Sequence, residues 1–256
     1  MFKQSYFSDV GSKRKSNQDS LALVKANTNY GEVLLATVCD GMGGHSMGEL
    51  ASKHCVTSLC GWFKKNLPIL LYEKSDDFDE SIKRELFDLV RQINLELVIY
   101  GRQTGTELGS TLTAMLFIRD KYYCVHVGDS RCYEIGYAIR QITEDQSLLA
   151  EEVRQGVITE AEAKADKRKN LLLESVGITT DVNPLFYCGD IKKGTLYLIC
   201  SDGLWHQLQE KDMQRYLDSA NIQDNRTLRM HLSYLTNMVM ERGEKDNITS
   251  IGIIPE

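Results

Sequence analysis

The sequence predicts an α+β fold in which two antiparallel β-sheets pack together and pairs of helices flank them, a four-layer α-β-β-α sandwich. Strand-like apolar runs come in two groups along the 256-residue chain, and helix-like segments also come in two groups. Strands and helices are therefore grouped rather than alternating, which favours antiparallel sheets. No Pro- or Ser-rich linker divides the chain, so we expect residues 1–256 to form one domain.

The first half of the chain is expected to begin with strands, continue with helices and return to strands. The expected elements are strands at 20–26 and 32–39, helices at 47–65 and 79–100, and strands at 110–118, 122–129 and 132–138. The second helix is the clearest, because its apolar residues recur every three or four positions and charged residues occupy the other face. Those apolar residues are Ile82, Leu86, Leu89, Ile93 and Leu97.

The second half begins with a charged segment of helical character at residues 144–180. Within it, Gly156 is suited to end a helix, and Thr159 with Glu162 matches the capping box that begins another. The high charge and weak apolar periodicity of the segment predict loose packing. The remaining expected elements are strands at 183–191, 195–202 and 247–254 and helices at 209–219 and 227–242.

Composition argues against several classes of protein. A net charge of −6 argues against a nucleic-acid partner, because binding to the phosphate backbone needs clustered Lys and Arg. No apolar run has signal-peptide or transmembrane character, so we expect a cytoplasmic protein without a membrane span. The seven cysteines form no C-x-x-C pair and lie mostly in apolar runs, which favours buried free thiols over disulfides or a zinc site.

Five aspartates are expected at compatible ends of the predicted strands. They are Asp40, Asp129 and Asp202, which follow apolar strands beside a glycine, and Asp19 and Asp246, which precede strands. In an antiparallel sheet the end of one strand shares an edge with the beginning of its neighbour, so the five carboxylates can gather along one edge. A single Asp beside a Gly is more often a plain turn, but five such residues at compatible ends favour a common site.

We interpret this group of carboxylates as a metal site, because clustered carboxylates repel one another unless a cation neutralises them. Oxygen ligands without convergent His or Cys suit Mg²⁺ or Mn²⁺ rather than zinc or copper. The glycines after Asp40 would let backbone carbonyls approach the ion. Arg14, five residues before Asp19, is placed to hold two phosphate oxygens, although an Arg in a basic tetrapeptide is usually a solvated surface residue.

Two other phosphate chemistries fit the sequence poorly. A nucleotide-binding G-x-G-x-x-G loop would need a glycine where the chain has Ser46, and no G-K-[ST] follows. A phosphatase cysteine would need an arginine six residues further on, in a C-x₅-R motif. The residues six positions after Cys39, Cys124 and Cys200 are His45, Ser130 and His206.

Seven short segments carry a resemblance to a known family. They are "GSKRKSNQD", "CDGMGGH", "LGSTLTA", "HVGDSR", "QITEDQS", "CSDGLW" and "KDNIT", in that order along the chain. In order and approximate spacing they resemble the motifs of the bacterial metal-dependent Ser/Thr protein phosphatases, the PPM or type 2C family. The resemblance covers almost the whole chain. It implies a β-sandwich flanked by helices, two Mn²⁺ or Mg²⁺ ions at one end of it, and a helical flap beside them, residues 144–180.

The resemblance also implies a set of metal ligands. Asp40 would bridge both ions, and the backbone carbonyl of Gly41 would bind one of them. Asp202 and Asp246 would complete the other. Asp129 matches an aspartate that binds a third, weaker ion together with Asp202 in bacterial members.

Two further residues match family positions that act on water and on substrate. Asp19 would orient metal-bound water, and Arg14 would hold the phosphate. Eukaryotic relatives use a His directly after the Asp-Gly pair as a general acid, but this chain has Met42 there and a histidine at His45 instead. His45 is therefore open to two interpretations, a general acid or a polar residue at the start of the 47–65 helix.

The resemblance predicts hydrolysis of phosphoserine and phosphothreonine in proteins, in signalling, reversing a Ser/Thr kinase. The two ions would lower the pKa of the water between them, and Arg14 and the cations would offset charge on the phosphate oxygens. Two alternatives stay open. One is a pseudophosphatase without turnover, which the complete set of aspartates argues against, and the other is an enzyme acting on small phosphoesters. The expected partners are phosphorylated proteins, substrates of a cognate kinase, and we expect a monomer.

Overall fold

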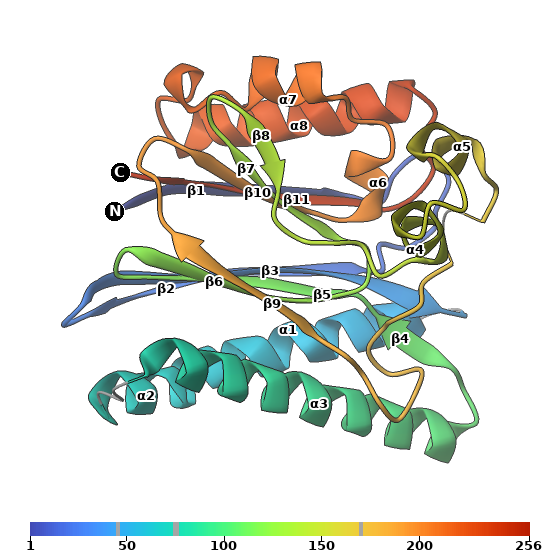
Figure 1. Cartoon of the computed structure of the whole chain (residues 1–256), viewed down its shortest axis with the longest axis horizontal. Coiled ribbons are helices and arrows are strands. Elements are labelled where there is room, and N and C mark those ends of the chain that lie inside the picture. The colour runs from blue at the N-terminus through green and yellow to red at the C-terminus, as the bar shows by residue number, and fades with distance from the viewer. Residues whose placement is uncertain (45–46, 74–76, 169–170) are drawn as a thin grey trace.

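Two β-sheets pack face to face, and helices cover the outer face of each, in the computed structural model of the chain (Figure 1). The structure describes residues 1–44, 47–73, 77–168 and 171–256. Neighbouring strands in both sheets run antiparallel. The arrangement confirms the predicted fold class.

The first sheet brings the two ends of the chain side by side. Its strands in spatial order are β1 (Phe2–Asp9), β11 (Ile248–Pro255), β10 (Leu196–Cys200), β7 (Arg131–Ile135) and β8 (Ile139–Gln141). The register pairs Cys200, the last residue of β10, with Arg131 at the start of β7 and with Ser250 near the start of β11. The segments after β10, before β7 and before β11 therefore meet at one edge.

The second sheet presents a matching edge. Its strands in spatial order are β2 (Asp19–Thr28), β3 (Gly31–Gly43), β5 (Leu112–Ile118), β6 (Lys121–Val127) and β9 (Leu185–Asp190), and β4 (Leu108–Ser110) pairs with the end of β3. The last residue of β6, Val127, pairs with Leu112 at the start of β5. The end of β6 therefore lies at the same edge as the beginning of β5.

Helices form the outer layers and the flap. The helices on the second sheet are α1 (Met47–Lys65), α2 (Leu67–Glu73) and α3 (Phe78–Thr104). Those on the side of the first sheet are α6 (Asp202–Trp205), α7 (Glu210–Tyr216) and α8 (Asn225–Glu241), with a 3₁₀ turn at Ser219–Asn221. The flap contributes α4 (Leu148–Arg154) and α5 (Glu160–Ala165), which lie at the end of the sandwich near α6 (Figure 1).

Alternation along the strands divides the core into layers. On β3, Val33 and Leu35 pack toward the helices of the second sheet, whereas Leu34 and Ala36 pack toward the first sheet. Between the sheets the rings of Phe117 and Tyr197 meet edge to face, with centroids 5.3 Å apart. A third apolar cluster lies between the first sheet and α7 and α8. Both sheets are thus buried on their two faces, which leaves the ends of their strands for polar side chains.

Most expected elements are found, but several features differ, among them the short elements β8 and α6, which were not predicted. Asp40 does not end its strand: β3 continues to Gly43, because residues 41–43 pair with β4. The strand β1 and the helix α2 were not predicted, since neither shows a clear apolar period in the sequence. The capping box of Thr159 and Glu162 is confirmed at α5, and Gly156 follows α4 with a φ of 71°.

All seven cysteines are free thiols, and most are buried, as expected. Cys60 is half-buried and Cys188 is exposed. In the described ranges, no helix combines the length and the apolar character needed to cross a membrane.

Candidate active site

Five aspartates gather at one end of the sandwich, and we call Asp19, Asp40, Asp129, Asp202 and Asp246 the carboxylate cluster. On the second sheet, Asp19 and Asp40 stand directly opposite each other in the β2–β3 register. Like charges in such a pair destabilise a sheet. The other three members lie in the segments after β6, after β10 and before β11. The strand register described above brings these segments to the same edge.

Two hydroxyl groups tie the sheets together at this edge. Ser201 Oγ donates a hydrogen bond to Asp19 Oδ2 (2.9 Å) and accepts one from the backbone N–H of Thr249 (3.0 Å). Thr111 Oγ1 accepts from the backbone N–H of Asp40 (2.9 Å) and lies 2.8 Å from the hydroxyl of Ser130. Ser201 thereby fixes Asp19 of the second sheet to the backbone of the first, and Thr111 links Asp40 to the segment that enters β7. Ser201 and Thr111 were not singled out from the sequence, although both fall inside quoted motifs.

Glycines at two positions allow the segments around the cluster to approach closely. A Cβ on Gly41 would lie 2.0 Å from the carbonyl oxygen of Gly48, and one on Gly203 would lie 2.0 Å from that of Asn247. Neither position can carry a side chain without moving the backbone. Gly203 thereby lets the start of α6, which carries Asp202, pack against the residue after Asp246.

Asn247 is a further residue that sequence reasoning missed. Its Nδ2 donates to the carbonyl oxygens of Val10 (2.9 Å) and Ser16 (3.1 Å), and its Oδ1 accepts from the backbone N–H of Gln18 (2.8 Å). This one amide side chain therefore holds the loop that carries Arg14. The signal in the sequence was its place in "KDNIT", directly after a predicted ligand.

Burial and neighbouring charges raise the pKa values of Asp19, Asp40, Asp129 and Asp202. Burial raises the pKa of Asp40 and of Asp202 well above the usual range, and the charges of the other cluster members raise both further. Burial and the charge of Asp145 raise the pKa of Asp129 to about 7, against the opposing effect of Arg131. Burial also raises the pKa of Asp19 to about 6, although hydrogen bonds from Thr249 and Ser201 oppose it.

The cluster has the donors that a hard divalent cation requires. Asp19 Oδ1 and Asp202 Oδ1 are buried and have no hydrogen-bond partner among the described residues, and buried oxygens of this kind are costly unless a cation or a donor reaches them. Among those same residues, no group of three or more His, Cys, Asp or Glu side chains is already arranged to hold a metal ion. Because clustered carboxylates repel one another, a bound cation is what would stabilise their approach to a common point. The all-oxygen donor set fits Mg²⁺ or Mn²⁺.

Arg14 lies at the rim of the cluster with its side chain half-exposed. Its Nη2 donates to Asp246 Oδ2 at 2.7 Å. This hydrogen bond is the main cause of its raised pKa, and the charges of Asp40 and Asp202 add to it. The guanidinium is thus held beside the cluster with other N–H groups directed to solvent, as a contact to phosphate oxygens would require.

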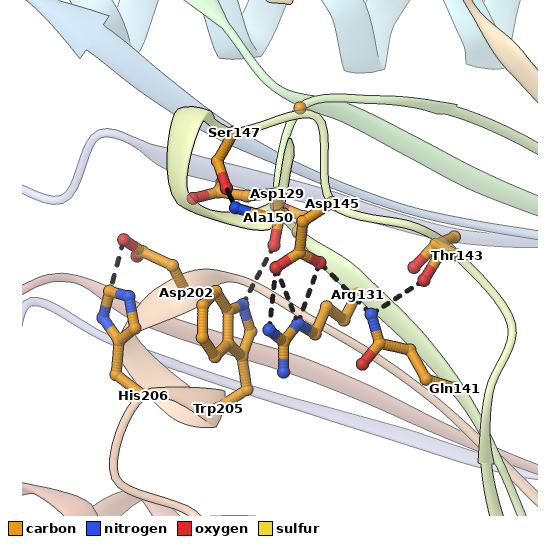
Figure 2. Close-up of polar contacts among 12 residues, drawn as sticks. Asp129, Arg131, Gln141, Thr143, Asp145, Ser147, Ala150, Asp202, Trp205 and His206 are labelled. Carbon is orange, nitrogen blue, oxygen red and sulfur yellow. Dashed lines mark hydrogen bonds and ion pairs between the residues drawn. The ribbon is translucent and has the colours of Figure 1, made fainter. Parts of the chain in front are cut away.

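Of the histidines that the structure describes, His206 is the one that contacts the cluster. His206, on the turn after α6, places Nδ1 3.7 Å from Asp202 Oδ2 (Figure 2). The same atom lies 3.8 Å from Glu244 Oε2. His126 is fully buried and hydrogen-bonded to Thr113, as its place on a strand predicts. His54 pairs with Glu96, and the ring of His231 bonds the carbonyl of Tyr216. His45, the expected alternative general acid, lies outside the described residues.

Comparison with known proteins decides the family. The family model described as "Protein phosphatase 2C" matches residues 11–233. The chain belongs to the protein phosphatase 2C family. Over 244 residues it is 31% identical to the serine/threonine phosphatase stp of Listeria monocytogenes, an alignment that covers 94% of this chain and 91% of that protein. This chain is thus a protein serine/threonine phosphatase.

Solved structures of other phosphatases have the same fold. The Streptococcus agalactiae serine/threonine phosphatase matches with a TM-score of 0.84 and 28% identity, covering all of both chains. The catalytic domain of PstP, solved in complex with two manganese ions, matches with a TM-score of 0.79 and 27% identity, covering 99% of this phosphatase and 97% of that chain. The likeness extends over the whole sandwich and its flap.

Proposed function

We propose that this phosphatase is metal-dependent and holds two divalent cations, Mn²⁺ or Mg²⁺, in the carboxylate cluster. The proposed ligands are Asp40, the carbonyl of Gly41, Asp202 and Asp246, with Asp129 and Asp202 holding a third, weaker ion. The observation that carries the proposal is the convergence of five like charges, two with buried oxygens that lack a partner among the described residues, on one edge of the sandwich. The two manganese ions of the related PstP structure support it.

The chain's own groups have separate tasks in this proposal. When bound, the cations lower the pKa of water and neutralise phosphate charge. Asp19, fixed by the hydrogen bond from Ser201, keeps a carboxylate oxygen available to accept a hydrogen bond from water and so to orient it. Arg14 turns its remaining N–H groups toward the phosphate oxygens of the substrate and offsets their charge.

We infer that the whole of residues 1–256 forms one catalytic unit, with the flap at residues 144–180 beside the cluster. Its substrates are phosphoproteins, as the relatives' names imply, and we propose that a cognate Ser/Thr kinase produces them. We also propose a cytoplasmic monomer.

Chelation tests the proposed function directly. Activity on a phosphothreonine peptide should vanish in excess EDTA and return when Mn²⁺ or Mg²⁺ is added beyond the chelator. Undiminished activity in EDTA would overturn the metal proposal. A chain that binds the phosphopeptide but never turns it over with either cation would instead be the pseudophosphatase.

A further inference from the structure

Arg131, at the start of β7, makes contacts that the proposed chemistry does not use. Its guanidinium stacks on the ring of Trp205, with Cζ 3.4 Å from the ring centroid. Its Nε and Nη2 donate to the carboxylate of Asp145 at 2.9 and 2.7 Å (Figure 2). Its Nη1 donates to the hydroxyl of Tyr133 at 3.0 Å. One side chain therefore uses both its face and its edge, which a lysine could not do.

Trp205 connects this arginine to the carboxylate cluster. It is the last residue of α6, the short helix that begins at Asp202. Its Nε1 donates to the backbone carbonyl of Asp129 at 3.0 Å (Figure 2). The indole thus spans the distance between the segments that carry Asp129 and Asp202, the proposed pair for the weaker cation.

Asp145 connects the same arginine to the flap. The next residue, Gln146, exchanges two hydrogen bonds with Gly128: its N–H donates to the carbonyl oxygen (2.8 Å), and its Oε1 accepts from the N–H (2.9 Å). Ser147 then caps the N-terminus of α4. Because Asp145 and Gln146 are buried, the flap begins from a fixed anchor, although α5 further along buries no residue.

We propose that Arg131 is a positioning residue that couples the flap to the carboxylate cluster through Trp205 and Asp145. The inference rests on the proposed function, which assigns the cations to the cluster. The stack holds α6 and the backbone of Asp129 in place, and the bidentate ion pair holds the first residues of the flap. Loss of the guanidinium should therefore have two effects at once. It should loosen the flap, and it should displace Trp205, which donates to the backbone carbonyl of Asp129.

Arg140 on β8 provides a matched control. It also pairs with a carboxylate, Glu134, and also donates to a tyrosine hydroxyl, that of Tyr122. It belongs to the same sheet, but within the described residues its hydrogen bonds and ion pair reach neither the cluster nor the flap. Arg140→Lys therefore removes a similar set of bonds without touching the proposed coupling.

The test compares Arg131→Lys with Arg140→Lys by hydrogen–deuterium exchange of metal-free protein. Arg131→Lys should speed exchange of the backbone amides of residues 146–154, and Arg140→Lys should not. Arg131→Lys should also lower kcat/KM on a phosphothreonine peptide by about tenfold, while kcat/KM on a small aryl phosphate changes by less than about threefold. Unchanged exchange in Arg131→Lys, or equal loss on both substrates, would overturn the proposal.

Trp205→Phe separates the two arms of the coupling and serves if Arg131→Lys does not fold. Phenylalanine keeps a ring for the guanidinium but cannot donate to Asp129. Hydrogen–deuterium exchange of the flap amides should stay as in the unaltered protein. The affinity of the weaker Mn²⁺ site, measured by titration calorimetry, should fall by about fivefold. Unaltered Mn²⁺ affinity would overturn the link to Asp129. The exchange experiment uses neither metal nor substrate, so it judges the coupling even if the proposed function fails.

Discussion

At the scale of single residues, Asp202 combines three properties that a structural aspartate seldom has. It is buried, its Oδ1 lacks a hydrogen-bond partner in the described part of the chain, and neighbouring carboxylates raise its pKa. A group in this position costs stability in the absence of a cation. Its presence is therefore better explained by ligand binding than by folding.

Asp202→Asn should lower kcat by at least about 100-fold, because a neutral amide cannot balance dication charge. The same change removes one of several like charges, so Tm in EDTA should not fall. Steady-state kinetics with Mn²⁺ and thermal unfolding with EDTA check both expectations. Asp88→Asn, at an exposed position on α3, is the control and should change neither. A variant at position 202 with most of its activity would refute the assignment of this ligand.

Arg14→Ala should raise KM for a phosphopeptide by about tenfold or more, because the guanidinium addresses the phosphate. Mn²⁺ affinity should stay the same or increase, since removal of the Nη2 contact frees Asp246 Oδ2 for the cation. Steady-state kinetics beside titration calorimetry separates the two effects. A parallel loss of Mn²⁺ affinity would show that Arg14 is structural instead.

His126 gives a prediction about pH. Burial lowers its pKa from 6.5 to about 4, so between these values the unfolded chain binds a proton that the folded chain does not. Its contribution to stability is therefore complete above pH 6.5 and is lost as pH falls, by up to about 3 kcal/mol at pH 4. Denaturant unfolding at several pH values should show a steeper loss of the free energy of unfolding than in His126→Asn. If the free energy of unfolding fell equally steeply with pH in both proteins, the lowered pKa of His126 would be contradicted.

At the scale of elements, the flap is anchored at its start and loose beyond it. Its first helix caps on Ser147 and buries Leu149, whereas α5 buries no residue and the turn after it is tied to α4 by the exposed ion pair of Arg168 with Glu152. Exposed pairs of this kind contribute little to stability. The flap therefore has a distal part that can vary without disturbing the cluster.

Replacing residues 160–169 with a short Gly-Ser linker should change rates on phosphopeptides much more than on a small aryl phosphate. The peptide extends from the site over the neighbouring surface, whereas the aryl phosphate needs only the cations and Arg14. Parallel kinetics on the two substrates measures the difference. Tyr137→Gly, at the exposed tip of the β7–β8 turn, is the control and should leave both rates unchanged. Proportional loss on both substrates would mean that the segment supports the metal site.

At the scale of the whole molecule, the cluster joins the two sheets at their shared end. Cation binding should therefore stabilise the fold as a unit, by about 2.7 kcal/mol when free Mn²⁺ exceeds its Kd a hundredfold. Thermal unfolding across a Mn²⁺ titration should show a rising Tm in the unaltered protein and a smaller rise in Asp202→Asn. A Tm that does not respond to Mn²⁺ or Mg²⁺ would argue against cation binding in the cluster.

Much of this architecture was predictable from local pattern. The helix expected at 47–65 has those bounds, and the spacing of its apolar residues faces the second sheet. The aspartates were recognisable because each adjoins an apolar strand or a glycine. By contrast, β1 was missed because it forms by pairing with β11 at the other end of the chain, which no local period records.

The sequence by itself determined the fold class, because strands and helices follow from periodicity. It also determined which aspartates are candidate ligands and that they share one end of the sheets, because this follows from residue chemistry beside the predicted strands. Only the tertiary structure decided how they meet. The register that sets Asp19 opposite Asp40, the extension of β3 to Gly43, and the bond of Ser201 to Asp19 across the two sheets all depend on long-range pairing. The same holds for the stack of Arg131 on Trp205, since only packing brings residues 74 positions apart into contact.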